Sequence, residues 1–95
     1  MHLSFEGTVF EWRGPAPYYF VRVPDDDAAR IGEVASMVTY GWGVIPCTVT
    51  IGSTTVTTSL FPKDGGYLVP IKNALRLPEM LLVGDIVEVT LSIAV

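Results

Sequence analysis

Two basic side chains and one carboxylate form the clearest candidate site in the sequence. Lys72 and Arg76 are spaced i,i+4, so on a short helix they share one face. An ammonium beside a guanidinium attracts anions. Asp85 comes just before the last expected strand, and we expect the chain to bring it within reach of Lys72 and Arg76. The three residues predict a site for a small anion or an acidic partner surface. The alternative is a structural ion pair between Asp85 and one of the bases, with no ligand.

Aromatic side chains near the ends of expected strands form a second candidate. Tyr40, Trp42 and Tyr67 could line the mouth of a small barrel and hold a ligand. In a domain of this size, aromatic side chains also commonly fill the barrel instead. Both interpretations stay open. The same set includes Trp12, Tyr18 and Tyr19.

The residues that metal sites and nucleophilic sites need are scarce. His2 is the one histidine and Cys47 the one cysteine, and Cys47 falls in the inward phase of a strand, as a packed thiol does. The three aspartates at 25–27 suit the N-terminal end of a helix better than they converge on one cation. We therefore expect no metal, no cofactor and no Ser-His-Asp or Cys-His catalytic arrangement. A lone cysteine and no secretory leader indicate the cytoplasm.

Alternation of apolar and polar residues predicts six strands. The pattern is most regular in "DIVEVTLSIAV" at 85–95 and in "IPCTVTI" at 45–51. Turns at 52–53 and 63–66 join neighbouring strands into hairpins. In the first strand the apolar residues up to Val9 share one face, but Phe10 and Trp12 fall on the other. We interpret this change as a bulge or bend near Gly7.

The helical segments are few. The aspartates open a helix of about three turns with an apolar stripe, and a short helical turn covers residues 72–77 and ends before Pro78. The order strand, strand, helix, three strands, short helix, strand predicts one mainly β domain over residues 1–95. We expect a barrel of Greek-key or double-split type, because closure removes exposed strand edges.

Charge restricts the classes of partner. Ten acidic and six basic residues give a net charge of −4, and the bases are scattered along the chain. We therefore expect neither nucleic acid nor an anionic membrane surface as a partner. The uncharged segment 34–62 is broken by Gly and Pro and rich in Thr, so it predicts strands rather than a spanning helix. Its outward positions carry no charge to oppose edge pairing, which predicts a homodimer.

Several short motifs resemble the bacterial domain-of-unknown-function 1905 family (DUF1905). They are Trp42-Gly43, "SLFPK" at 59–63, Gly65-Gly66-Tyr67, Lys72 with Arg76, Gly84-Asp85, Val23-Pro24 and the N-terminal "FEGTVFEW". The resemblance covers nearly the whole chain and implies a small β-barrel with no assigned activity. One departure is "LRLPEMLLVGD", where relatives are more polar and helical.

These observations together predict a non-enzymatic binding or interaction module whose partner is a small molecule or a protein. Two rivals belong to other classes: an AbrB-like DNA-binding barrel, which the ending "GDIVEV" superficially resembles, and an enzyme acting on a small substrate. The acidic balance disfavours the first rival. The scarcity of acid, base and nucleophile groups disfavours the second.

Overall fold

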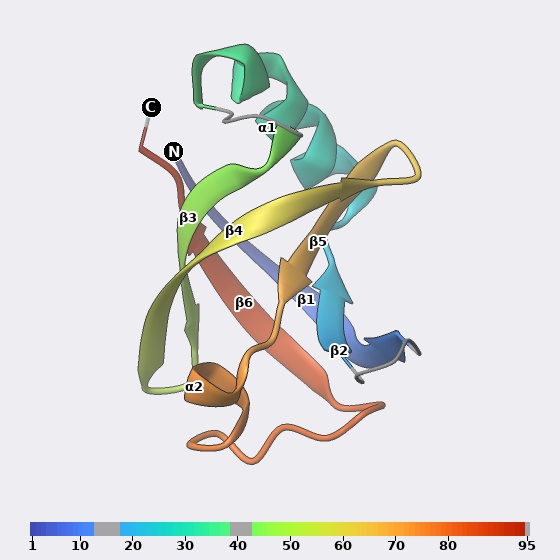
Figure 1. Cartoon of the computed structure of the whole chain (residues 1–95), viewed down its shortest axis with the longest axis vertical. Helices are drawn as coiled ribbons and strands as arrows, with labels where there is room; N and C mark the ends of the chain where they lie inside the picture. Colours follow the sequence, from blue (N-terminus) through green and yellow to red (C-terminus); the bar gives the residue numbers. More distant parts are fainter. Residues whose placement is uncertain (13–17, 39–42, 95) are drawn as a thin grey trace.

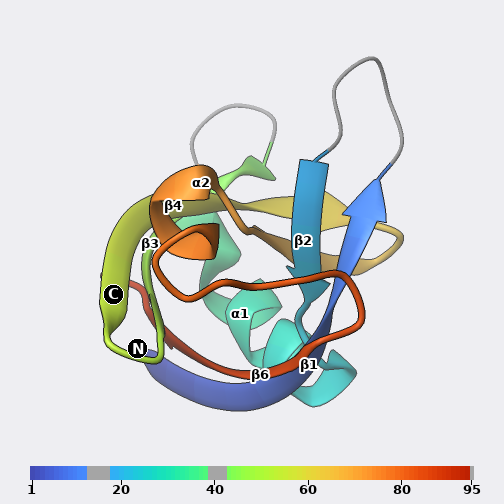
Figure 2. The same ribbon diagram turned by 90° about the horizontal axis from the view of Figure 1, so that it is seen from below.

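The computed structural model describes residues 1–12, 18–38 and 43–94. Within these residues, six antiparallel strands close into a barrel in the order β1-β2-β5-β4-β3-β6 (Figures 1 and 2). The predicted fold class and element order are confirmed. The elements are β1 His2–Trp12, β2 Tyr18–Arg22, α1 Asp25–Val38, β3 Ile45–Ile51, β4 Thr54–Lys63, β5 Gly66–Pro70, α2 Asn73–Arg76 and β6 Ile86–Ser92.

Two long strands, β1 and β4, join the two halves of the barrel. Residues 2–8 of β1 pair with β6 and residues 9–12 pair with β2. In β4, residues 54–60 pair with β3 and residues 61–63 pair with β5. Strand β6 pairs with both β1 and β3 and so completes the ring. Each long strand therefore has a different neighbour along each part of its length.

The barrel interior is filled mainly by aliphatic side chains at alternate strand positions, joined by Phe5 and Cys47. In β3 the burial alternates at every residue, as its sequence predicts. Full burial of one such side chain stabilises the fold by about 1.5–3 kcal/mol. Helix α1 lies at one end of the barrel and α2 at the other (Figure 1). Ile31 of α1 and Leu75 of α2 are fully buried, so each helix closes its end with an apolar residue.

Helix α1 has 14 residues, which is about four turns rather than the expected three. Its three aspartates lie in the first turn, as expected, where they oppose the helix dipole. Helix α2 begins after Lys72 and ends at Arg76, with Leu77 as its C-cap. The predicted hairpin turn at 63–66 is confirmed, since both Asp64 and Gly65 have the positive φ that a tight two-residue hairpin favours.

Of the two explanations for the change of face near Gly7, a bulge or a bend, the bulge is wrong. The register between β1 and β6 advances one residue at a time from His2 to Thr8 without a break. Strand β1 bends where its partner changes from β6 to β2 (Figure 2), and Phe10 and Trp12 lie on its outer face. They belong to a second apolar cluster outside the barrel. This cluster lies on the face that strand alternation predicts to be exposed to solvent.

The segment between α2 and β6 is tied to the barrel by polar contacts. The Glu79 carboxylate accepts hydrogen bonds from the hydroxyls of Thr54, at 2.6 Å, and Ser53, at 3.4 Å. The Gly84 amide donates to the carbonyl of Val9, and the Val9 amide donates to the carbonyl of Asp85. Among the residues described, neither helix has the length and apolarity needed to cross a membrane.

Candidate functional site

Each of the three residues of the first candidate site has contacts of its own. Lys72 precedes α2 and is exposed. The Arg76 guanidinium lies 4.5 Å from the centre of the Tyr19 ring and donates to Asn73 Oδ1 at 3.2 Å. The Asp85 carboxylate accepts the Leu82 amide at 2.8 Å, a contact within its own loop.

The alternative of an ion pair at this site can also be compared with the geometry. Across residues 1–12, 18–38 and 43–94 the ion pair present joins Asp27 to Arg30 at 4.0 Å, so Asp85 forms none with Lys72 or Arg76 there. A binding role for Lys72 and Arg76 stays a prediction.

The second candidate falls partly outside the described residues. Tyr40 and Trp42 belong to the segment 39–42, which the structure does not describe. Tyr67 and Tyr19 are partly buried and pack against the barrel core. Tyr67 also lines a shallow hollow of about 600 Å³ beside α1. Both Tyr67 and Tyr19 therefore contribute to packing, and a ligand-binding role for Tyr67 stays a prediction.

A hollow on the outer wall of the barrel was missed by the sequence analysis. We call it the aromatic groove. It has a volume of about 410 Å³ and is formed by β1, β2, β4 and β5. An adjoining bay of about 340 Å³ shares Tyr18, Phe20 and Phe61 with it and extends to Lys72. The groove is lined by Trp12, Tyr18, Phe20, Phe61, Pro62, Lys63 and Leu68.

Strand register brings the groove's aromatic rings together. Phe10 lies opposite Phe20 in the β1–β2 ladder, and Trp12 lies opposite Tyr18. The centre of the Phe20 ring is 6.1 Å from the ring centres of Phe10, Trp12 and Phe61. This spacing is within the range of favourable aromatic pairs. Phe20 is therefore the hub of the cluster.

The cluster has a buried floor and exposed walls. Phe20 and Leu68 are only 6% and 3% exposed, although both lie outside the barrel core. Trp12, Phe61 and Tyr18 are 44%, 45% and 61% exposed. Contact with water is unfavourable for exposed apolar side chains, so the rings of these walls would gain from being covered. The walls thus offer ring faces to a ligand, while the floor holds them in place.

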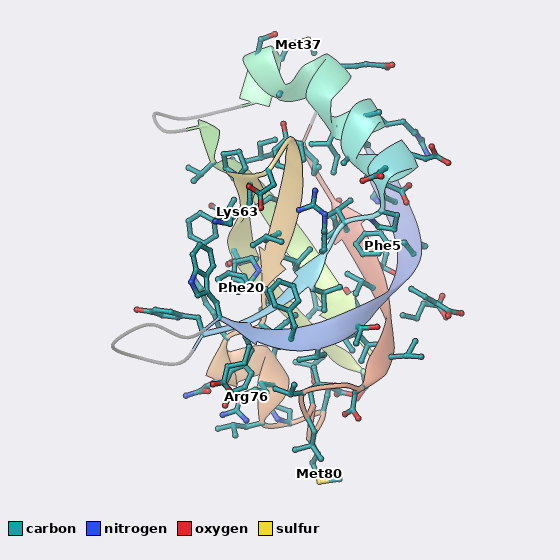
Figure 3. All side chains as sticks on the ribbon, turned by 90° about the vertical axis from the view of Figure 1, so that its right-hand side faces the viewer. Phe5, Phe20, Met37, Lys63, Arg76 and Met80 are labelled. Atoms are coloured by element: carbon teal, nitrogen blue, oxygen red, sulfur yellow. The ribbon has the colours of Figure 1, made fainter. Side chains whose placement is uncertain are left out.

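Cations lie at the rim of the groove. The Lys63 ammonium is 4.1 Å from the centre of the Trp12 ring, a cation–π contact. The Arg22 guanidinium donates to the carbonyls of Lys63 and Asp64 at 3.2 and 3.3 Å, which fixes the adjacent turn. Figure 3 shows Lys63, Phe20 and Arg76 one below another along one side of the barrel. A ligand with an anionic group would find its counter-charge at this rim.

Groups for covalent or metal chemistry are sparse. Cys47 points into the barrel, and burial raises the pKa of its thiol to about 11 although a hydrogen bond with the Leu60 backbone lowers it. The thiol therefore stays protonated at neutral pH and is a weak nucleophile. In the part of the chain that the structure describes, no three His, Cys, Asp or Glu side chains gather as metal ligands. The arrangement is suited to binding by stacking and charge.

A family model described as "Domain of unknown function (DUF1905)" matches residues 5–91, which is nearly the whole chain. No curated protein matches the sequence.

Proposed function

Because the chain belongs to the DUF1905 family, whose description assigns no activity, we propose from the geometry of the aromatic groove that it is a non-enzymatic binding module. The observation that carries this proposal is the set of exposed rings, Trp12, Tyr18 and Phe61, above the buried Phe20. Ring faces held open to solvent favour a flat apolar group, which would displace water from them.

The size and charge of the groove define the ligand further. Its volume of about 410 Å³ lies in the range of small-molecule sites. Lys63 beside Trp12 favours a ligand that carries an anionic substituent on its ring system. The cytoplasm is the compartment we propose, since the protonated, buried thiol of Cys47 suits a reducing environment.

The dye anilinonaphthalene sulfonate tests this proposal, because it combines flat rings with one anionic group. We expect its fluorescence to rise on the folded protein. Trp12→Leu and Phe61→Leu should each weaken binding by up to about tenfold, the equivalent of roughly 1.4 kcal/mol. Both substitutions keep an apolar side chain but remove the ring.

Ile86→Ala provides the matched control. Ile86 is 71% exposed on β6 and is not among the groove residues. The control should bind the dye as the parent does, and cooperative thermal unfolding of all three variants would show that they fold. Equal dye binding by the parent and both ring variants would refute the groove as the binding site.

A further inference from the structure

Basic residues that are far apart in the sequence gather around the aromatic groove. Of the five Lys and Arg residues that the structure describes, four lie here. Lys63 lines the groove, Lys72 lines the adjoining bay, and Arg22 borders the neighbouring hollow that includes Trp12 and Leu68. The fourth, Arg76, stacks on Tyr19 at the edge of the bay. The basic residues are scattered along the sequence, as noted above, but folding brings these four to one side of the surface.

Most acidic residues lie on other elements. Helix α1 carries four, at 25–27 and 33, and Glu88 lies on β6, while Glu6 lies in the part of β1 that pairs with β6. Three carboxylates lie beside the groove. Glu11 and Asp64 line the hollow next to Arg22, and Asp25 lines another hollow together with Lys63. The net charge of −4 therefore belongs to the molecule as a whole, and the groove has a local excess of bases over acids.

The bases and rings form a strip rather than a point. Lys63 pairs with Gly66 at the start of β5, and Lys72 follows two residues after β5 ends. Six residues of extended chain at 3.3 Å each span about 20 Å between them. Phe61 and Tyr18 line both the groove and the bay, so they occupy the middle of this strip.

We propose that the aromatic groove and its bay bind single-stranded nucleic acid, an inference that rests on the function proposed above. Unpaired nucleobases would stack on the faces of Trp12 and Phe61, because every nucleobase offers a ring face. The phosphates would lie near the ammonium groups of Lys63 and Lys72. A nucleic acid strand alternates flat rings with anionic phosphates along its length. This matches a strip with basic side chains at both ends and aromatic side chains between them.

Two related partners fit the strip less well. A duplex keeps its bases stacked on one another, so they cannot stack on Trp12 or Phe61. An acidic peptide supplies carboxylates to the lysines, but it has no flat ring in each residue to cover the exposed aromatic side chains. Both partners serve as arms of the test.

The experiment measures fluorescence anisotropy of labelled oligothymidylate and oligouridylate of about twelve nucleotides, a length within the usual site size. We expect Trp12→Leu and Phe61→Leu each to weaken binding about tenfold. Lys63→Gln and Lys72→Gln should each reduce the slope of log affinity against log salt by about 0.7. Arg30→Gln, on α1 and away from the groove, should leave affinity and slope unchanged.

The outcomes separate this inference from the proposed function. If the dye binds at the groove but neither oligonucleotide does, the inference is wrong and the function stands. Polyglutamate that competes as well as oligothymidylate would identify an acidic protein as the partner and overturn the inference. A duplex that binds more tightly than the single strand, or a loss in Arg30→Gln equal to that in Lys63→Gln, would also overturn it. If neither dye nor oligonucleotide binds, both proposals fail.

Discussion

Gly7 shows how one missing side chain permits the packing of two strands. It lies opposite Val87 in the β1–β6 ladder, and a Cβ at this position would collide with Cγ1 of Val21 on β2. Val21 is completely buried, so it has little room to move. We predict that Gly7→Ala lowers the free energy of unfolding by about 1–3 kcal/mol, as overpacking does. Urea denaturation measures this change.

The same substitution at Gly32 should have the opposite sign. Gly32 is exposed on α1, and a Cβ there would have no atom within 4 Å. Alanine favours the helix by about 1 kcal/mol over glycine, so Gly32→Ala should raise stability. Parent-like stability of Gly7→Ala would contradict the close approach of β1 and β2.

At the scale of elements, alternation predicted the inner face of the strands but not their outer face. The segment "IPCTVTI" coincides with β3, because its inward positions are apolar and its outward ones polar. Phe10 and Trp12 broke that pattern and were one signal of the groove, and the aromatic set near the strand ends, with Trp12 and Tyr18, was another. Phe20 and Phe61 could not be added to them from sequence, since their contact depends on the register of β2 and β4 across β5. Pairing between distant strands is not encoded in local periodicity.

The first candidate site was limited by the same cause. Spacing placed Lys72 and Arg76 on one short helix, which is confirmed to the extent that α2 follows Lys72 and includes Arg76. Spacing could not show that Asp85 would bond to the Leu82 amide or that Arg76 would stack on Tyr19. Those contacts depend on the path of the loop and on a strand more than fifty residues earlier in the chain.

The β1–β6 ladder contains a repulsive pair. Glu6 and Glu88 are exposed and directly opposite each other, where like charges destabilise a sheet. We predict that Glu88→Lys raises the free energy of unfolding by about 0.3–1 kcal/mol at low salt. Denaturant unfolding should show that the gain fades near 1 M salt, where screening acts over about 3 Å. A gain that persists at high salt would rule out an electrostatic origin.

At the scale of the whole molecule, association is the property that the sequence predicted and that is still to be measured. Residues 54–60 of β4 pair with β3, and pairing with β5 begins only at Phe61. Within the ladders of the described residues, the second edge of 54–60 has no strand partner, and the segment carries no charge. We predict a homodimer through this edge, with twice the chain mass of 10.3 kDa by light scattering.

One substitution at this edge tests the dimer. Thr57 is exposed on β4, so Thr57→Lys should yield a monomer, because it places a charge at the contact. Thr8→Lys, exposed on β1, should leave the dimer intact. A parent protein with the mass of one chain would contradict the prediction.

The closure of the barrel by β6 has a consequence for synthesis. Residues 2–8 of β1 leave the ribosome before the other strands of the barrel, yet their ladder partner is β6, which follows about 80 residues later. At 5–20 residues per second, these residues wait about 4–16 s for it. During that interval the nascent chain presents an unpaired strand, and a ribosome that stalls before residue 86 leaves an open sheet. Exposed edges of this kind are what chaperones and neighbouring nascent chains capture, so the order of translation itself sets when this domain is most vulnerable.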